Sequence, residues 1–441
     1  MILKNVAIEN FRIIENCGFK FDNKFNLIIG NNGTGKTSIL EAITIGLGGF
    51  LAGMNDIKTI HVSKEDVRMI GTLAGEGSYD IKYATPTTVH CTVEYGNEDI
   101  ISWTRTKSSF KSSRTTTPKN ISNYASKLVN DNDSVLPIIS YQSAGRMWSQ
   151  KRDKWQDVFK GTYSRSIGYT DCLATESNIK MFTNWCKKME QVSWQQGRKI
   201  AEYEEVKKAV GKFMAVLEKH DINSTIFYDK RTDEVVYSSD GEIIPMRLMS
   251  TGYRSLIGMV ADIAYRMAVL NPNLKNEIIE RTNGIILIDE IDLHIHPKWQ
   301  WSIIDALIAT FPNTQFIATT HSPIIIASCR NRNIISLFDS DLTTSKIELG
   351  SNNNKSPYGW QVNDVLNKFM GVDERIPELK VKLKRVEELT LKKMKNKLMD
   401  TEVVELKTLK EELYSDLPEN DSAVELMELE SIQNIINTES I

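Results

Sequence analysis

The chain has 441 residues, of which 41% are hydrophobic and 25% are charged, and its formal net charge is −3 at pH 7. This length predicts about two to three domains, and the composition is typical of a globular protein with a large core. A slightly acidic chain has no overall field that attracts nucleic acid, so any DNA contact must come from a local basic patch.

The cysteines and the N-terminal residues indicate a reducing compartment. The cysteines are odd in number and form no C-x-x-C pair, which argues against a disulfide framework and a cysteine zinc site. Residues 1–5 run directly into an alternating strand pattern, which differs from a signal peptide. The most apolar stretch, residues 39–54, carries Glu41 and is too short and glycine-broken for a membrane span. We therefore expect a cytoplasmic protein without membrane contact.

The first functional motif is the octapeptide G-N-N-G-T-G-K-T at residues 30–37, between a β-like run at 25–29 and a helical run at 38–45. It has the form G-x-x-x-x-G-K-[ST] of a phosphate-binding loop. Glycines let the backbone direct its N–H groups at a phosphate, and the helix N-terminus adds partial positive charge. Lys36 is predicted to bind the β- and γ-phosphates of ATP, and the Thr37 hydroxyl is predicted to bind Mg²⁺. The other residues expected to contact the nucleotide are Asn31, Asn32, Gly33, Thr34, Gly35 and Ser38.

Residues 80–245 are predicted to form an inserted region of strands and helices. Antiparallel strands are expected between 81 and 103, helices over 148–217 and a hairpin over 226–244. The segment Arg105–Lys119 has five basic residues, no acidic residue and many Ser and Thr residues. Such a composition is typical of a flexible surface loop, which is either a linker or a contact to DNA phosphates.

An apolar helix is predicted from about 252 to 270, and β/α elements follow it. Residues 284–288 are continuously apolar, as expected for a parallel strand buried on both faces. The strand is followed by Asp289, predicted to hold Mg²⁺ through water, and by Glu290, which is placed to orient or deprotonate the attacking water. The later elements are a helix at 298–310, a strand at 315–319, a helix at 323–328 and a strand at 333–337.

Five motifs in their order along the chain resemble those of ABC-type ATPases of the Rad50/SMC/RecF branch, and within it the compact family of "overcoming lysogenisation defect" (OLD-like) proteins. They are the P-loop, Gln142 in I-I-S-Y-Q, M-S-T-G-Y-R at 249–254, L-I-D-E at 287–290 and T-T-H-S-P at 319–323. The I-E-N-F-R run at 8–12 matches as well. The compact relatives that the chain looks most like include the ATPase subunits of two-gene anti-phage systems of the Septu type (PtuA-like), which are paired with an HNH nuclease.

The resemblance implies an α/β fold: an ABC-type ATPase head over residues 1–350, with a mixed P-loop sheet, an antiparallel β subdomain and a helical subdomain. Residues 351–441 are expected to form a C-terminal helical region for assembly or partner docking. This region is charge-segregated, since residues 379–399 carry eight basic residues and acidic residues dominate from 400 onward. A solvated helical hairpin would give the same charge pattern.

The resemblance also implies roles for single residues. Ser250 and Gly252 match the signature motif, which in this family contacts the γ-phosphate held by the other subunit, although Met249 replaces a usual Leu. The remaining matches are Gln142 with the metal-sensing glutamine, Asp292 with the D-loop that crosses the dimer, and His321 with the switch histidine that reaches the γ-phosphate. Gln142 also fits a surface residue before a helix, and His321 also fits a helix cap. His294 and His296 show no third ligand nearby, so a metal pair is not expected there.

Segments that would support other activities are not found. About 210 residues separate Ser38 from Met249 without a long heptad run, so chromosome tethering is not expected. Asp339-Ser340-Asp341 is a D-x-D, but no acidic residue lies between His321 and Asp339, so we interpret it as a turn and not as part of a nuclease.

The sequence therefore predicts a slow ATPase without a nuclease of its own, which forms at least a homodimer around two ATPs and controls a separate HNH-type nuclease. One alternative is a RecF-like DNA-repair clamp that uses ATP to grip DNA. The other is a sensor that keeps ATP bound without turnover.

Overall fold

The computed structural model describes residues 1–75, 78–96, 99–147, 159, 164–176, 179–220, 223–330, 333–338, 346–349, 357–373, 375–395 and 397–428. Contacts divide the chain into two compact units, Met1–Val365 and Leu366–Ile441. The D-x-D at 339–341 lies outside the described residues, as do 148–158 and 160–163 of the predicted helical region. None of the described helices is both long enough and apolar enough to cross a membrane.

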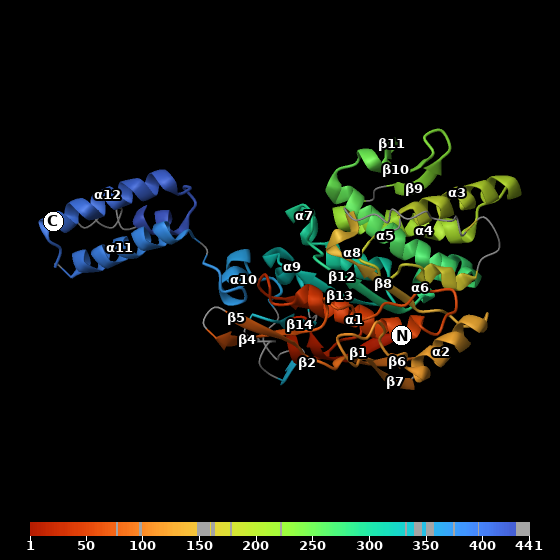
Figure 1. Ribbon diagram of the computed structural model, residues 1–441. Coiled ribbons are helices and arrows are strands. Elements are labelled where there is room, and N and C mark those ends of the chain that lie inside the picture. Colours follow the sequence, from red (N-terminus) through yellow and green to blue (C-terminus); the bar gives the residue numbers. More distant parts are fainter. Residues whose placement is uncertain are drawn as a thin grey trace. The chain divides into compact units, whose positions relative to one another are not determined.

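A parallel sheet in the first unit carries the predicted nucleotide-binding motifs (Figure 1). Its strands lie in the order β14–β3–β13–β12–β8, and every neighbouring pair is parallel. Their bounds are Asn333–Ser336 (β14), Phe25–Ile29 (β3), Thr314–Thr320 (β13), Gly284–Ile288 (β12) and Ile138–Gln142 (β8). Strands β3, β13, β12 and β8 are buried throughout, as predicted for the apolar run at 284–288. Because all strands point the same way, their carboxyl ends meet at one edge of the sheet, where ligands bind in open α/β folds.

A second sheet is mainly antiparallel, with the strand order β15–β2–β1–β6–β7, and within it only β15 pairs in parallel. Its strands are β15 (Lys346–Leu349), β2 (Ile14–Lys20), β1 (Ile2–Phe11), β6 (Thr87–Tyr95) and β7 (Asp99–Lys107). Helix α1 (Lys36–Leu51) follows the P-loop and contacts both sheets. A Cβ atom on Gly46 would lie 2.3 Å from the Cys91 sulfur, so a glycine is required where α1 meets β6. The predicted α/β fold class, with a P-loop sheet and antiparallel strands, is confirmed.

The remaining part of the first unit is mainly helical. Its long helices are α3 (Ile179–Gln196), α4 (Ala201–Glu218) and α5 (Thr251–Leu270). The hairpin predicted over 226–244 has a third strand, because the chain turns at both Asp233 and Asp240, which adopt φ of 55° and 49°. The three strands are β9 (Ser224–Asp229), β10 (Glu234–Ser239) and β11 (Glu242–Pro245).

Shorter elements complete the first unit. The helix predicted at 298–310 is divided into α7 (Pro297–Gln300) and α8 (Ile303–Thr310). Part of the region predicted as helical before α3 is a 3₁₀ helix at Arg165–Tyr169. The other elements are β4 (Met69–Gly75), β5 (Ser78–Tyr83), α2 (Lys119–Asn130), α6 (Ile278–Arg281) and α9 (Pro323–Ser328). Helix α10 (Val362–Lys368) includes the point in the chain where the first unit ends and the second begins.

The second unit contains α11 (Pro377–Met394) and α12 (Asp400–Asp416). Its buried apolar residues form a small core of their own: Val386, Leu389, Leu406, Leu413, Val424 and Met427. The basic charges of α11 pair with acidic charges of α12, as in the bidentate contact of Arg385 with Glu405 at 2.7 and 2.8 Å. Solvent screens exposed pairs of this kind, so they contribute little and the apolar core is the main source of stability.

The first prediction concerns the close approach of β8 and β12 at Gly284. Gly284 has φ of 148°, and a Cβ atom there would lie 1.9 Å from the main-chain oxygen of Ile138. Gly284→Ala is therefore expected to lower the free energy of unfolding by about 3 kcal/mol or more, measured by urea denaturation. Gly258→Ala is the control, because none of the described atoms lies within 4 Å of the added atom. Equal midpoints for Gly284→Ala and wild type would contradict the described strand contact.

Candidate nucleotide-binding site

The P-loop connects β3 to α1 in a conformation that requires glycine. Gly33 and Gly35 have φ of 81° and 93°, in the left-handed region that other residues rarely adopt. Lys36 is only 6% exposed, and its ammonium donates to the main-chain oxygens of Gly30 at 2.8 Å and Asn31 at 2.9 Å. Burial lowers the pKa of Lys36, and the nearby carboxylates of Asp289, Glu290 and Asp292 oppose this shift. The lysine is thus held across the loop as a cation that an incoming phosphate can bind.

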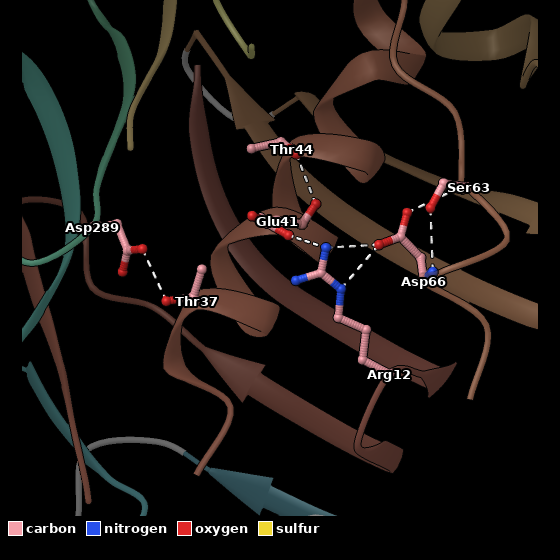
Figure 2. A network of polar contacts seen from close by, with 7 residues as sticks. All are labelled: Arg12, Thr37, Glu41, Thr44, Ser63, Asp66 and Asp289. Atoms are coloured by element: carbon pink, nitrogen blue, oxygen red, sulfur yellow. Dashed lines mark hydrogen bonds and ion pairs between the residues drawn. The ribbon is translucent and has the colours of Figure 1, made fainter. Parts of the chain in front are cut away.

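Asp289 joins the P-loop to β12. The Thr37 hydroxyl donates to Asp289 Oδ2 at 2.9 Å (Figure 2), and Asp289 itself is 2% exposed. Asp289 Oδ1 accepts a hydrogen bond from the Thr319 hydroxyl on β13 at 2.7 Å. Thr37 and Asp289 both offer oxygen ligands, which Mg²⁺ prefers, and a site with one carboxylate leaves room for phosphate oxygens and water. These residues therefore fit a Mg²⁺ ion that binds together with ATP.

Glu290 lies directly after Asp289 in an unusual backbone conformation. Its φ is 48°, although it is not a glycine. Its main-chain N–H donates to Thr319 Oγ1 at 2.8 Å, and the main-chain N–H of Ile291 donates to the main-chain oxygen of Thr319 at 2.9 Å. Surrounding contacts that over-determine a strained conformation are common at functional sites. The two hydrogen bonds to Thr319 fix the main chain at Glu290 and therefore the position from which its side chain extends.

Asp292 and His321 meet at the end of β13. The Asp292 carboxylate accepts hydrogen bonds from the Thr320 hydroxyl at 2.5 Å and the His321 N–H at 3.4 Å. Burial and the Lys36 ammonium lower the pKa of His321, so its imidazole is neutral at pH 7. The helix cap that was the alternative interpretation of His321 is supplied by its neighbour, because Ser322 Oγ accepts from the Ile325 N–H at 3.3 Å. His321 is therefore not the N-cap of α9.

The signature-like residues lie at the start of α5. Ser250 is the exposed N-cap, and its hydroxyl accepts from the Tyr253 N–H at 3.5 Å. A Cβ atom on Gly252 would lie 2.6 Å from the main-chain oxygen of His294, so this helix start packs against the turn that follows β12. Within the described residues, no hydrogen bond joins Ser250 to the P-loop of its own chain. The exposed helix start is thus open to a ligand held elsewhere.

Gln142 is the last residue of β8 and is buried, with 7% of its surface exposed. The interpretation of Gln142 as a surface residue is therefore wrong. Its main-chain oxygen accepts from the Asp289 N–H at 2.9 Å, which places the two residues side by side on adjacent strands. The amide nitrogen of its side chain donates to Ser140 Oγ and Asp262 Oδ2, at 3.0 and 2.8 Å.

Sequence reasoning did not identify the ionic network that holds the start of α1 (Figure 2). Arg12, from the I-E-N-F-R run, forms ion pairs with Glu41 of α1 and with Asp66, the latter at 2.8 Å. Asp66 is fixed in turn by the Ser63 N–H at 2.9 Å. Burial raises the pKa of Glu41, and Arg12 opposes the shift. In the sequence, Arg12 belongs to the I-E-N-F-R motif, whereas Asp66 lies in no motif.

The structure contradicts two members of the proposed basic DNA-binding loop, Arg105–Lys119. Arg105 and Lys107 belong to β7 and are 0% and 1% exposed. Arg105 donates to the main-chain oxygens of Ile45 at 2.8 Å and Ile60 at 2.6 Å, and Lys107 donates to that of Val62 at 3.3 Å. Buried main-chain carbonyls require donors, and these cations supply them. The basic residues that remain exposed are Lys111, Arg114 and Lys119.

Comparison with known proteins supports the nucleotide site. A family model described as an AAA domain matches residues 5–231, just over half of the chain. A second AAA-domain model, whose description also names the AbiEii toxin and type IV toxin–antitoxin systems, matches residues 197–327.

Several curated relatives match along most of the chain. The "Retron Vc95 probable ATPase" of Vibrio cholerae serotype O1 biovar El Tor is 28% identical over 417 residues, which cover 82% of this chain and 78% of that protein. The "Septu protein PtuA" of Bacillus thuringiensis is 26% identical over 390 residues, 85% of each chain. These relatives confirm the resemblance to compact ATPases of the PtuA kind. Among solved structures, the Smc head bound to the C-winged helix domain of ScpA has a TM-score of 0.45 at 16% identity, covering 76% of this chain and 94% of that one, a likeness too weak to argue from.

The second prediction separates buried from exposed basic residues in the segment Arg105–Lys119. Arg105→Met is expected to lower the free energy of unfolding by about 2 kcal/mol, because buried carbonyls lose a charged donor. Lys111→Met is the control, since Lys111 is exposed, and its effect should stay within about 0.5 kcal/mol. Denaturant titration measures both. If Arg105→Met kept full stability but weakened retention on DNA, the original interpretation of Arg105 would return.

Proposed function

The chain belongs to the AAA-domain family, and we propose that it is the ATP-hydrolysing subunit of an anti-phage defence complex, in which two copies enclose ATP and control a separate nuclease. The observation that carries the ATP part is the contact of Thr37 with the buried Asp289, because it joins the P-loop to the acid after β12. The names of the relatives, Septu protein PtuA and retron ATPase, support the defence role.

The residues around the P-loop have complementary tasks in hydrolysis. Lys36 binds the terminal phosphates, and the loop N–H groups of residues 31–38 hold the others. Thr37 and Asp289, with Gln142 as a third ligand, would hold Mg²⁺, which neutralises phosphate charge when it is bound. Glu290 takes a proton from water as the water oxygen attacks the γ-phosphorus, and ADP leaves with the bridging oxygen. Neutral His321 donates a hydrogen bond to the γ-phosphate.

The proposed dimer follows because the P-loop and the signature residues of one nucleotide site would come from two different copies of the chain. One chain supplies one P-loop and one signature, and both Asn31–Gly33 and Ser250 are exposed. In the proposed dimer, Ser250 and Gly252 of one copy contact the γ-phosphate of the other, and Asp292 lies at the crossing between them. A change from 1:99 to 99:1 in favour of the closed dimer needs about 5.5 kcal/mol, or roughly 2.7 kcal/mol from each ATP. Hydrolysis removes these contacts and reopens the dimer.

The proposed docking region for the partner nuclease is the C-terminal helical region. Residues 351–441 are proposed to mediate assembly or docking of an HNH-type nuclease. Apolar side chains on the helices of the second unit support this role, since Val381, Met394 and Val404 are 68%, 67% and 66% exposed. The RecF-like alternative, in which the isolated protein grips DNA, is weaker because two of the five basic residues proposed for DNA are buried. Phosphate release distinguishes the proposed ATPase from a sensor that only retains ATP.

The third prediction tests Glu290. Glu290→Gln is expected to bind ATP normally, because the site for the phosphates is intact, but to release phosphate at least about 100-fold more slowly without its proton acceptor. The trapped ATP should accumulate the closed dimer, measured by light scattering. Glu280→Gln, an exposed substitution of the same kind, should behave like wild type. Normal phosphate release by Glu290→Gln would remove Glu290 from the catalytic role.

The fourth prediction tests the shared pocket by complementation. Lys36→Ala should lose ATP binding, and Ser250→Arg should bind ATP but fail to close the dimer. Mixed in equal amounts, the two inactive variants should recover at most about a quarter of wild-type turnover, since half of the dimers contain one intact composite site and a single ATP supplies only about half of the free energy of closure. Lys58→Ala, an exposed lysine variant, serves as the control for Lys36→Ala. Absence of recovery on mixing would refute a pocket built from two chains.

A further inference from the structure

The side-chain amide of Gln142 is held by residues away from the P-loop. Both of its N–H groups are engaged, one by Ser140 and the other by Asp262, which lies in α5, 120 residues further along the chain. A carboxylate can only accept hydrogen bonds, so the amide must turn its nitrogen toward Asp262. The opposite orientation would place two oxygens against each other. Asp262 therefore determines which end of the amide is the oxygen end.

The Asp262 carboxylate is itself fixed. Its Oδ2 atom also accepts from Arg266 Nε at 2.9 Å, one helical turn further along α5. Arg266 is 3% exposed and donates to the main-chain oxygens of Gly168 at 2.9 Å and Thr170 at 2.8 Å. The arginine of this ion pair is buried and anchored to two main-chain oxygens, so it holds the partly exposed Asp262 carboxylate in place. The orientation of the Gln142 amide thus depends on the position of α5.

We propose that Asp262 is a positioning residue for Gln142: by taking the amide nitrogen, it leaves Oε1 as the atom that binds Mg²⁺. This inference rests on the proposed role of Gln142 at the metal, beside Asp289. Residues that orient a metal ligand typically change metal affinity by about 10- to 100-fold when they are removed. Ser250 caps the same helix, twelve residues or about 18 Å away from Asp262. Helix α5 therefore presents the signature residues to a partner copy and also determines the orientation of the Gln142 amide in its own copy.

A purely structural role for Asp262 is the competing explanation, because Asp262 also neutralises the buried Arg266. The two explanations differ in one measurable quantity. A structural role changes the stability of the fold, whereas a positioning role changes the gain in nucleotide affinity that Mg²⁺ provides. The experiment therefore measures binding of a non-hydrolysable ATP analogue by calorimetry, with Mg²⁺ and with a chelator, using the full chain.

The fifth prediction is that Asp262→Ala reduces the Mg²⁺-dependent gain in affinity about tenfold and leaves binding in chelator unchanged. Asp262→Asn should retain most of the gain, because its amide oxygen can still accept the Gln142 N–H. Ser255→Ala is the matched control on the same helix, since its buried hydroxyl has no hydrogen-bond partner in the described part of the chain. Ser255, Asp262 and Gln142 also line a cavity of about 340 Å³, so shortening Asp262 extends space that already exists.

A double variant separates failure of this inference from failure of the proposed function. Gln142→Ala alone should lose the Mg²⁺-dependent gain, and Gln142→Ala with Asp262→Ala should lose no more, because Asp262 acts through Gln142. If Gln142→Ala keeps the gain, the proposed metal role of Gln142 is wrong, and the inference ends with it. If Gln142→Ala loses the gain and Asp262→Ala keeps it, only the positioning role is overturned. Should Asp262→Ala not fold because Arg266 is left buried without its partner, Asp262→Ala with Arg266→Met removes both charges and must show the same loss of the Mg²⁺-dependent gain; no loss overturns the inference.

Discussion

The nucleotide site depends on the buried carboxylate of Asp289, which holds the ends of three neighbouring structural elements together. One oxygen accepts from Thr37 at the start of α1, and the other accepts from Thr319 on β13. The Thr319 hydroxyl in turn accepts a hydrogen bond from the Glu290 N–H, which fixes the first residues of the turn after β12. Parallel strands bring these groups to one edge of the sheet, and their hydrogen bonds set the spacing between them. The P-loop, the acid pair and the end of β13 are therefore positioned by one carboxylate.

The residues of the site that lie in compact motifs could be predicted from the sequence. The P-loop and the Asp289-Glu290 pair are each preceded by an apolar strand, and in parallel sheets strand ends and functional residues coincide. Asp262 and Asp66 could not be predicted, because they meet Gln142 and Arg12 only through the tertiary fold, and one residue has no local signal for such a partner. Arg105 was misjudged for a related reason. A run of cations predicts an exposed loop, whereas the main-chain carbonyls that bind Arg105 belong to α1 and to the loop that follows it.

The charge pattern of the C-terminal helices has a simple explanation inside the second unit. A basic α11 and an acidic α12 are what a helical pair needs when its apolar core is small, since Lys382 and Arg385 find carboxylates on the facing helix. Charge segregation alone is therefore no argument for a partner. The exposed apolar residues of these helices support the proposed docking of a partner more strongly, because the ion pairs between α11 and α12 do not cover them.

The backbone at Glu290 has an implication for the evolution and engineering of this chain. A glutamate held at φ of 48° stores strain of about 1 kcal/mol or more that a glycine at the same place would release. A selection for heat resistance alone would thus favour the loss of the carboxylate proposed to activate water. Stabilised variants found without a test of phosphate release would be enriched in inactive proteins, so screens on this scaffold need turnover as a second criterion.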